Sequence, residues 1–124
     1  MRLLLCCALT LLACGDDDGG GGSGADAAAS GRACATGLEA DAPTAIASPA
    51  LECPSRVCLH VEGASPDLCT DDCEEASDCV GAVASGCAGD FVCAAPVEVG
   101  PFACRKVCVC DSVVPAGGFP VDCP

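Results

Sequence analysis

Residues 99–110 read VGPFACRKVCVC, and the cysteines in this stretch decide the class of fold. From Phe102 to Val109 the residue types alternate, which predicts a β-strand that directs Cys104, Cys108 and Cys110 to one side. Cys108 and Cys110 are separated by one residue, and a disulfide between them would be a strained small ring. They are therefore expected to pair with two different cysteines and to fix this segment at two points.

The residues around this strand predict little regular structure. Residues 91–93 and 97–99 are expected to be partner strands, with a turn at Gly100-Pro101. Residues 70–76 (TDDCEEA) predict one helical turn capped by Thr70. Residues 117–120 predict a terminal loop fastened by Cys123, and the lone histidine, His60, is expected in an exposed loop.

The N-terminus predicts a lipoprotein signal peptide. Met1 and Arg2 precede an apolar run, Leu3 to Ala13, that is too short to span a bilayer but fits the core of a signal peptide. The run ends in Leu-Leu-Ala-Cys14, which resembles the bacterial lipobox. Cleavage before Cys14 and acylation of its thiol would give stable membrane anchoring through two or more acyl chains. An ordinary secretory signal with a chance cysteine is the alternative.

The cysteine count is consistent with this assignment. The chain has 15 cysteines in 124 residues, which is typical of a disulfide scaffold. Cys6 and Cys7 leave with the signal peptide and Cys14 carries lipid, so an even number remains for pairing. The expected disulfide framework comprises Cys34, Cys53, Cys58, Cys69, Cys73, Cys79, Cys87, Cys93, Cys104, Cys108, Cys110 and Cys123. The connectivity among them stays open.

The predicted fold class is a small disulfide-rich domain with sparse short β-strands and loops, up to six disulfides and little core. The chain has no Trp or Tyr and only three Phe. Ala and Cys supply much of the hydrophobic fraction, so large apolar side chains are scarce. A small domain of this kind depends on covalent or metal staples for its stability.

The chain divides by composition into four parts. We expect a signal peptide at 1–13, the lipid-attachment site and a flexible Gly/Asp/Ala linker at 14–33, an extended Ala/Pro-rich segment at 34–52, and a disulfide-rich head at 53–124. The spacing Cys58-x10-Cys69-x3-Cys73 recurs 35 residues later from Cys93. This suggests two related units, 53–86 and 87–124, with coincidence of spacing as the alternative.

The composition argues against several classes of function. The formal net charge of −13 is unfavourable for nucleic-acid binding, which needs Lys and Arg. Zinc sites favour Cys-x2-Cys pairs, which the sequence lacks, and the best remaining candidates for ligands would be Cys108 and Cys110. Two acidic groups, at 16–18 and 71–78, are expected to be solvated rather than to bind a cation. No catalytic residue, metal site or cofactor is predicted, and the chain is not expected to be an enzyme.

Two stretches carry a resemblance to a known group of proteins. Cys69-Thr-Asp-Asp-Cys73 and residues 97–110, VEVGPFACRKVCVC, resemble cysteine-rich lipoproteins of myxobacterial type. The resemblance covers roughly residues 53–112, together with the lipobox and the linker. It implies a cell-envelope or secreted location and implies no activity or functional residues.

The leading functional hypothesis is a structural or interaction lipoprotein of the bacterial cell envelope. It would be held in the lipid bilayer, expected to be the outer membrane, by acylated Cys14 and would contact an envelope or extracellular protein. The alternative is a ligand-binding or protease-inhibitor-like module that presents the clamped loops 59–68 and 94–103, because loops held by disulfides are rigid before binding. A metal-storage protein is a third class and would require free thiols.

Overall fold

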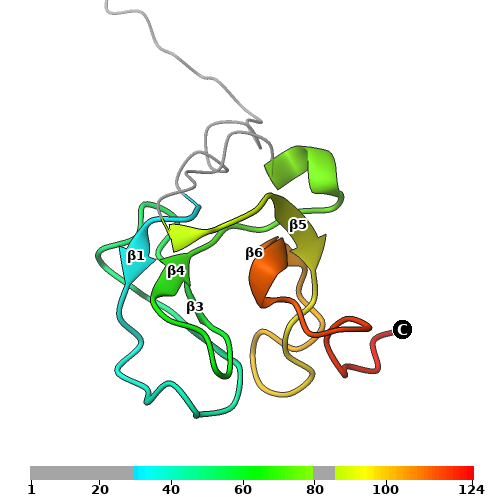
Figure 1. Cartoon of the computed structure of the whole chain (residues 1–124), viewed down its shortest axis with the longest axis horizontal. Helices are drawn as coiled ribbons and strands as arrows, with labels where there is room; N and C mark the ends of the chain where they lie inside the picture. The colour runs from blue at the N-terminus through cyan, green and yellow to red at the C-terminus, as the bar shows by residue number, and fades with distance from the viewer. Residues whose placement is uncertain (1–29, 80–85) are drawn as a thin grey trace, which may run out of the picture.

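The structure is a computed structural model that describes residues 30–79 and 86–124. The predicted signal peptide, Cys14 and most of the predicted linker lie outside these residues. Within the described residues, no helix has the length and apolar character needed to cross a membrane. The described residues form two small antiparallel sheets and two short 3₁₀ helices (Figure 1).

The first sheet has four very short strands in the order β1-β4-β3-β2. Its strands are β1 (Ala33–Cys34), β2 (Ala45–Ala47), β3 (Cys58–His60) and β4 (Asp67–Cys69). Leu59 faces Leu68 across the central β3–β4 pair, and both side chains are buried. The disulfide Cys34–Cys58 joins β1 to β3, and Cys53–Cys69 ties β4 to the loop before β3.

The second sheet is a pair of strands, β5 (Phe91–Ala94) and β6 (Val107–Cys110). The 3₁₀ helices are η1 (Ala76–Cys79) and η3 (Asp111–Val113). Four disulfides hold this part, namely Cys73–Cys93, Cys79–Cys108, Cys87–Cys110 and Cys104–Cys123. The structure therefore has six disulfides and sparse strands, as the predicted fold class requires, and Cys108 and Cys110 take different partners.

β6 confirms the predicted alternation over part of its length. All four of its residues are buried. Val107 and Val109 pack with Leu59 and Val61 of the first sheet, whereas Cys108 belongs to a separate cluster of disulfide sulfurs. A strand whose two faces are both covered needs no polar side, and this accounts for the Val-Cys-Val-Cys sequence.

Residues 97–104 differ from the prediction. Residues 97–99 form no strand, and β6 begins at Val107 rather than at Phe102. The expected turn at Gly100-Pro101 is present, with Gly100 at φ 88° and Cys104 at φ 58°. Proline has no N–H to donate to a ladder, so the prolines at 96 and 101 favour a closed loop over a hairpin. Cys104 consequently lies in the turn and not on the strand.

The predicted helical turn at residues 70–76 is also wrong. Thr70 caps no helix, because its side chain is buried and donates to Cys108 O at 2.6 Å. The one helical turn of this region is η1, further along the chain. Its Asp78 carboxylate accepts hydrogen bonds from the backbone N–H groups of Glu74 and Glu75, at 2.8 and 3.0 Å.

The expected boundary of the head at Cys53 needs correction. The segment 34–52 is part of the folded head, since β1 pairs with β4 and β2 pairs with β3. The sequence did not indicate this role, since the segment has few large apolar residues and edge strands as short as three residues carry almost no periodic signal. The described fold therefore begins before Cys34.

The disulfides divide the head at a different place from the predicted boundary between residues 86 and 87. Two bonds lie within residues 34–69 and four lie within residues 73–123, so none of the six crosses residues 70–72. The cysteines that recur at the same spacing do not occupy equivalent positions in the fold. Cys58 and Cys69 face each other on neighbouring strands, whereas Cys93 is on β5 and Cys104 is in a turn.

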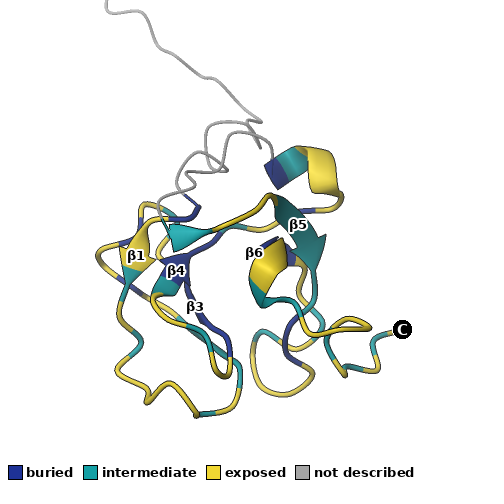
Figure 2. Ribbon diagram, viewed as in Figure 1, coloured by how far each residue is buried: buried dark blue, intermediate teal, exposed yellow. Residues whose placement is uncertain are grey.

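Noncovalent contacts join the two disulfide-stapled parts. The cluster of Leu59, Val61, Val107 and Val109 lies between them, and Figure 2 shows the buried course of β3. Backbone hydrogen bonds of the 70–72 segment add to it, because Thr70 N donates to Val57 O of the first part at 3.1 Å and Cys108 N of the second part donates to Asp71 O at 3.0 Å. The 70–72 segment thus serves as the seam between the two parts.

The substitution Thr70→Val tests this seam. Valine keeps the shape of the side chain but leaves Cys108 O without the hydroxyl donor, which should lower the free energy of unfolding by about 1–3 kcal/mol. Guanidinium unfolding of the oxidised protein measures the change. The exposed Ser77→Ala is the matched control, and equal stability of the two variants would contradict a structural role for the Thr70 hydroxyl.

Candidate binding groove

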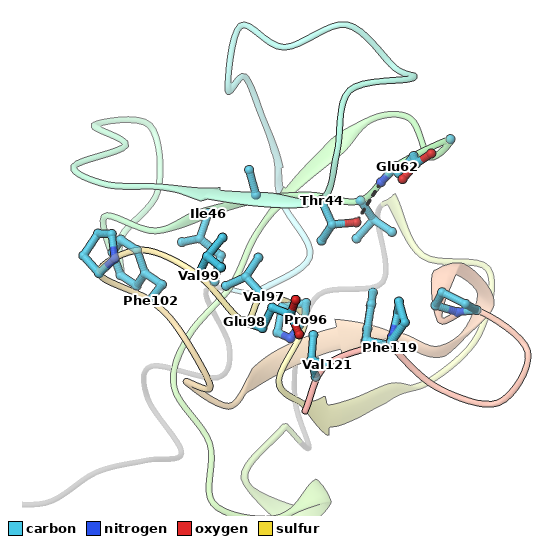
Figure 3. Close-up of a pocket in the computed structure, with 16 residues that line it drawn as sticks. Thr44, Ile46, Glu62, Pro96, Val97, Glu98, Val99, Phe102, Phe119 and Val121 are labelled. Carbon is cyan, nitrogen blue, oxygen red and sulfur yellow. Dashed lines mark hydrogen bonds between the residues drawn. The ribbon is translucent and has the colours of Figure 1, made fainter. Parts of the chain in front are cut away.

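An open groove of about 690 Å³ lies on the surface of the described residues. It lies where the first sheet, the loop before β6 and the C-terminal segment meet (Figure 3). The groove is lined by Thr44, Ala45, Ile46, Val61, Glu62, Gly63, Pro96, Val97, Glu98, Val99, Pro101, Phe102, Pro115, Phe119, Pro120 and Val121. Most of these side chains are apolar.

One wall comes from the first sheet. β2 supplies Ala45 and Ile46, and the turn after β3 supplies Glu62 and Gly63. Glu62 N donates to Thr44 Oγ1 at 3.1 Å, which holds the turn beside β2. In Figure 3, Thr44, Ile46 and Glu62 lie together on one side of the groove, and the labelled residues of the other walls face them.

The opposite wall is the closed loop 96–102. Cys93 and Cys104 fix its two ends through separate disulfides, and Cys104 N donates to Val97 O at 2.8 Å across its base. Val97 is buried at 9% exposure, whereas Val99 at the tip is 77% exposed. An exposed valine beside other apolar side chains is a potential contact for a partner.

The C-terminal segment completes the groove. Phe119, half-buried against the cluster of Leu59 and Val109, lines it together with Val121. The disulfide Cys104–Cys123 ties this segment to the end of loop 96–102. Two walls of the groove are therefore covalently joined, which limits how far they can separate.

The charges of the groove have a single sign. Of the described residues, Glu62 and Glu98 are the only charged ones that line it, and both are exposed. They lie on different walls, one after β3 and one in loop 96–102. Among the described residues no lysine or arginine lines the groove. Arg105 lies over the ring of Phe102, 5.2 Å from its centroid, but its charge is paired with Asp72. The two glutamates therefore make the potential of the groove negative, in a chain whose net charge is −13.

Both loops singled out from the sequence contribute to this groove. Loop 59–68 is the β3–β4 hairpin and supplies Val61, Glu62 and Gly63, while loop 94–103 supplies most of the opposite wall. Sequence reasoning missed β2 and the C-terminal segment. The sequence of the C-terminal segment did offer evidence for an apolar wall, because residues 113–121 (VVPAGGFPV) combine prolines with apolar residues just before a cysteine.

His60 does not lie in an exposed loop as predicted. It is in β3 with 1% exposure, and its Nδ1 lies 2.7 Å from Asp67 Oδ1 and its Nε2 3.1 Å from Ala42 O. A histidine–carboxylate pair is part of some hydrolase sites, but there the second ring nitrogen faces a nucleophile. Here it faces a backbone carbonyl, so the pair acts as a structural clamp between the 36–42 segment and the sheet.

Asp67 is the centre of this clamp. Its Oδ2 accepts hydrogen bonds from Thr36 N at 2.9 Å and Thr36 Oγ1 at 2.5 Å, in addition to the His60 contact of Oδ1. Partial burial raises the pKa of Asp67, but the hydrogen bonds from Thr36 and the neighbouring His60 outweigh burial and hold the pKa below its usual value. The clamp therefore stabilises the ionised carboxylate.

The remaining clusters of potential metal ligands are occupied by other interactions. Among the described residues, two groups of closely spaced sulfurs, around Cys69 and Cys108, consist of cysteines alone, and a third combines Cys87 and Cys110 with Asp111. All of these cysteines form disulfides. A disulfide sulfur is not a thiolate and does not act as a zinc ligand. Among the acidic residues at 71–78, Asp72 pairs with Arg105 and Asp78 accepts two backbone hydrogen bonds. The proposed lipid-attachment residue, Cys14, lies outside the described residues.

The substitution Asp67→Asn tests the clamp. At neutral pH it should lower the free energy of unfolding by about 2 kcal/mol, because charged hydrogen bonds are lost. The pKa of Asp67 is lower in the folded than in the unfolded chain, so the stabilisation is present above the unfolded-state pKa and is lost as the pH falls through the folded-state pKa.

The difference in stability between wild type and Asp67→Asn should accordingly shrink below about pH 4. Thermal unfolding followed by circular dichroism between pH 2 and 7 measures it. The exposed Asp41→Asn serves as control. A stability difference that stays constant across this pH range would show that the Asp67 charge does not stabilise the fold.

Comparisons with known proteins assign no function to the groove. No protein-family model matches the chain, and neither a curated protein nor a solved structure matches it.

Proposed function

We propose that this chain is an interaction module of the bacterial cell envelope, anchored by acylated Cys14 and without catalytic activity. The observation that carries the proposal is the open apolar groove, whose loop 96–102 is held at both ends by disulfides and is joined by one of them to the C-terminal wall. The partner that fits this proposal is an envelope or extracellular protein, and the outer membrane is the proposed location.

The rigidity of the groove supports a role in binding. Ligand sites are mostly concave, apolar and largely formed before binding. The ends of loop 96–102 are held by two disulfides, and the C-terminal wall is held by one of them. Less conformational entropy is lost when such a surface binds a partner, so a small module can bind usefully with a modest area.

The environment of the titratable groups supports a role without catalysis. Both ring nitrogens of His60 are engaged, and the described cysteines are all in disulfides. Catalysis by these residues would require a base within reach of a nucleophile. The carboxylates of the groove, Glu62 and Glu98, belong to exposed residues, although Glu98 Oε2 accepts a hydrogen bond from Asp122 N at 3.4 Å. They are better suited to attract a partner.

The anchoring part of the proposal rests on the sequence Leu-Leu-Ala-Cys14 after an apolar run. The substitution Cys14→Ser removes the thiol that would be acylated, so the protein should move from the membrane fraction to the soluble exported fraction. Fractionation and metabolic labelling with a fatty-acid analogue measure this. The matched control is Cys7→Ser, which should leave both localisation and labelling unchanged.

Free-thiol titration of the Cys14→Ser protein checks the division of the cysteines. The head should keep its six disulfides and expose no free thiol. Retention of the variant in the membrane, or a free thiol in the head, would contradict the assignment of Cys14 to lipid.

The interaction part is tested by photo-crosslinking in cells that produce the full chain. A photoreactive amino acid in place of Val99 should give a discrete adduct with one envelope or extracellular protein, because Val99 projects from the groove wall at 77% exposure. The same amino acid in place of Leu51, which is 75% exposed and outside the groove, should give none.

Equal adducts at the two positions, or none at Val99, would contradict binding through the groove. The inhibitor alternative has a specific observation in its favour, since Val99 and its neighbours form an exposed tip between two disulfides. It would be supported if the adduct partner is a protease whose activity falls on binding.

A further inference from the structure

We propose that the groove binds an extended peptide segment that pairs with the outer edge of β2, directs apolar side chains into the groove and carries Lys or Arg at its ends. This inference rests on the proposed interaction function and adds the chemistry of the partner. It follows from three properties of the groove, which are an unpaired strand edge, walls poor in hydrogen-bond donors and a negative charge on both sides.

The outer edge of β2 is available for pairing. β2 is the last strand of its sheet and pairs with β3 alone. Within residues 30–79 and 86–124, the edge of Ala45–Ala47 away from β3 has no hydrogen-bond partner. Strand edges of this kind pair readily with an added chain, and the short alanine side chains leave room for its backbone.

Loop 96–102 and the C-terminal segment can contribute apolar contacts but few hydrogen bonds. Pro96, Pro101, Pro115 and Pro120 lack an N–H group, and the side chains that project between them are mainly valine and phenylalanine. A ligand that depended on polar contacts to both walls would lose hydrogen bonds with water here. An extended peptide avoids this loss, because its backbone can bond to β2 while alternate side chains meet the apolar wall.

The charges favour basic residues at the ends of the peptide. Glu62 and Glu98 stand on different walls and are both exposed, and the described residues that line the groove include no lysine or arginine. Lysine or arginine beside either carboxylate gains a modest, salt-dependent attraction, and acidic residues are repelled. The same argument disfavours a second copy of this chain as the occupant, since each copy carries a formal charge of −13.

The test uses the full oxidised chain and three kinds of synthetic probe. The first is the labelled peptide Lys-Lys-Val-Thr-Val-Thr-Val-Lys-Lys, the second is its counterpart with glutamate in place of every lysine, and the third is the first peptide with N-methyl groups on the valines or, separately, on the threonines. Fluorescence anisotropy at low salt measures each Kd. The lysine peptide should bind at least about tenfold more tightly than the glutamate peptide.

N-methylation distinguishes strand pairing from a purely electrostatic contact. Successive N–H groups of an extended chain point to opposite sides, so only one of the two methylated sets faces β2. That set should weaken binding by about tenfold or more, while the other set should leave the Kd nearly unchanged. Equal effects of both methylated peptides would overturn the β2 pairing.

Variants of the protein locate the site. Val99→Ser should weaken binding of the lysine peptide by about tenfold or more without affecting the fold, because it removes a mostly exposed apolar contact and adds no charge. Leu51→Ser, outside the groove, should bind as wild type. The double change Glu62→Lys with Glu98→Lys should reverse the preference between the two probes. The control double change Glu39→Lys with Glu75→Lys alters the net charge equally at exposed residues outside the groove and should keep the original preference.

The outcomes separate this inference from the function on which it rests. Equal affinity for the lysine and glutamate probes, or reversal by the control double change, would overturn the proposed partner chemistry. If the Val99 crosslink persists while no peptide binds, the interaction function stands and the extended-peptide inference fails. A dimer in sedimentation that Val99→Ser dissociates would identify a second copy as the occupant and would also overturn the inference.

Discussion

Disulfide pairing is the constraint on which the rest of this structure depends. The chain has few large apolar side chains, and its buried residues include more cysteines than any other type. Each native disulfide contributes about 2–4 kcal/mol, mainly by restricting the unfolded chain. The bonds close segments of 16 to 29 residues, so strands of only two to four residues can persist where an uncrosslinked domain would need longer ones.

The positions of the disulfides also determine where two parts of the molecule are joined without a crosslink, by the backbone and by noncovalent contacts. No disulfide crosses residues 70–72, so the two stapled parts meet through the valine–leucine cluster, the buried hydroxyl of Thr70 and backbone hydrogen bonds. The groove opens where segments from both parts come together. Its walls are individually rigid, and their separation depends on that apolar cluster. Binding and stability are therefore linked through the same few side chains.

The fold class could be predicted because it follows from cysteine number and parity, which need no knowledge of contacts. The strand at Val107–Cys110 could be predicted because valine and cysteine alternate along it, and in the structure both of its faces are buried. β2 could not be predicted, because a three-residue edge strand of Ala-Ile-Ala carries no periodic signal. His60 was misplaced for a related reason. Its burial depends on Asp67 and on the carbonyl of Ala42, and neither partner can be recognised from the sequence around the histidine.

The sequence by itself determined that this is a small disulfide-stapled domain, and it supplied the loops between Cys58 and Cys69 and between Cys93 and Cys104 as candidate binding elements. Only the tertiary structure decided which cysteines pair, because parity constrains the number of bonds and leaves their connectivity open. It alone brought the two loops to one groove with β2 and Phe119. Such a site exists only in three dimensions, since its walls come from separate segments between residues 44 and 121 that no local pattern connects.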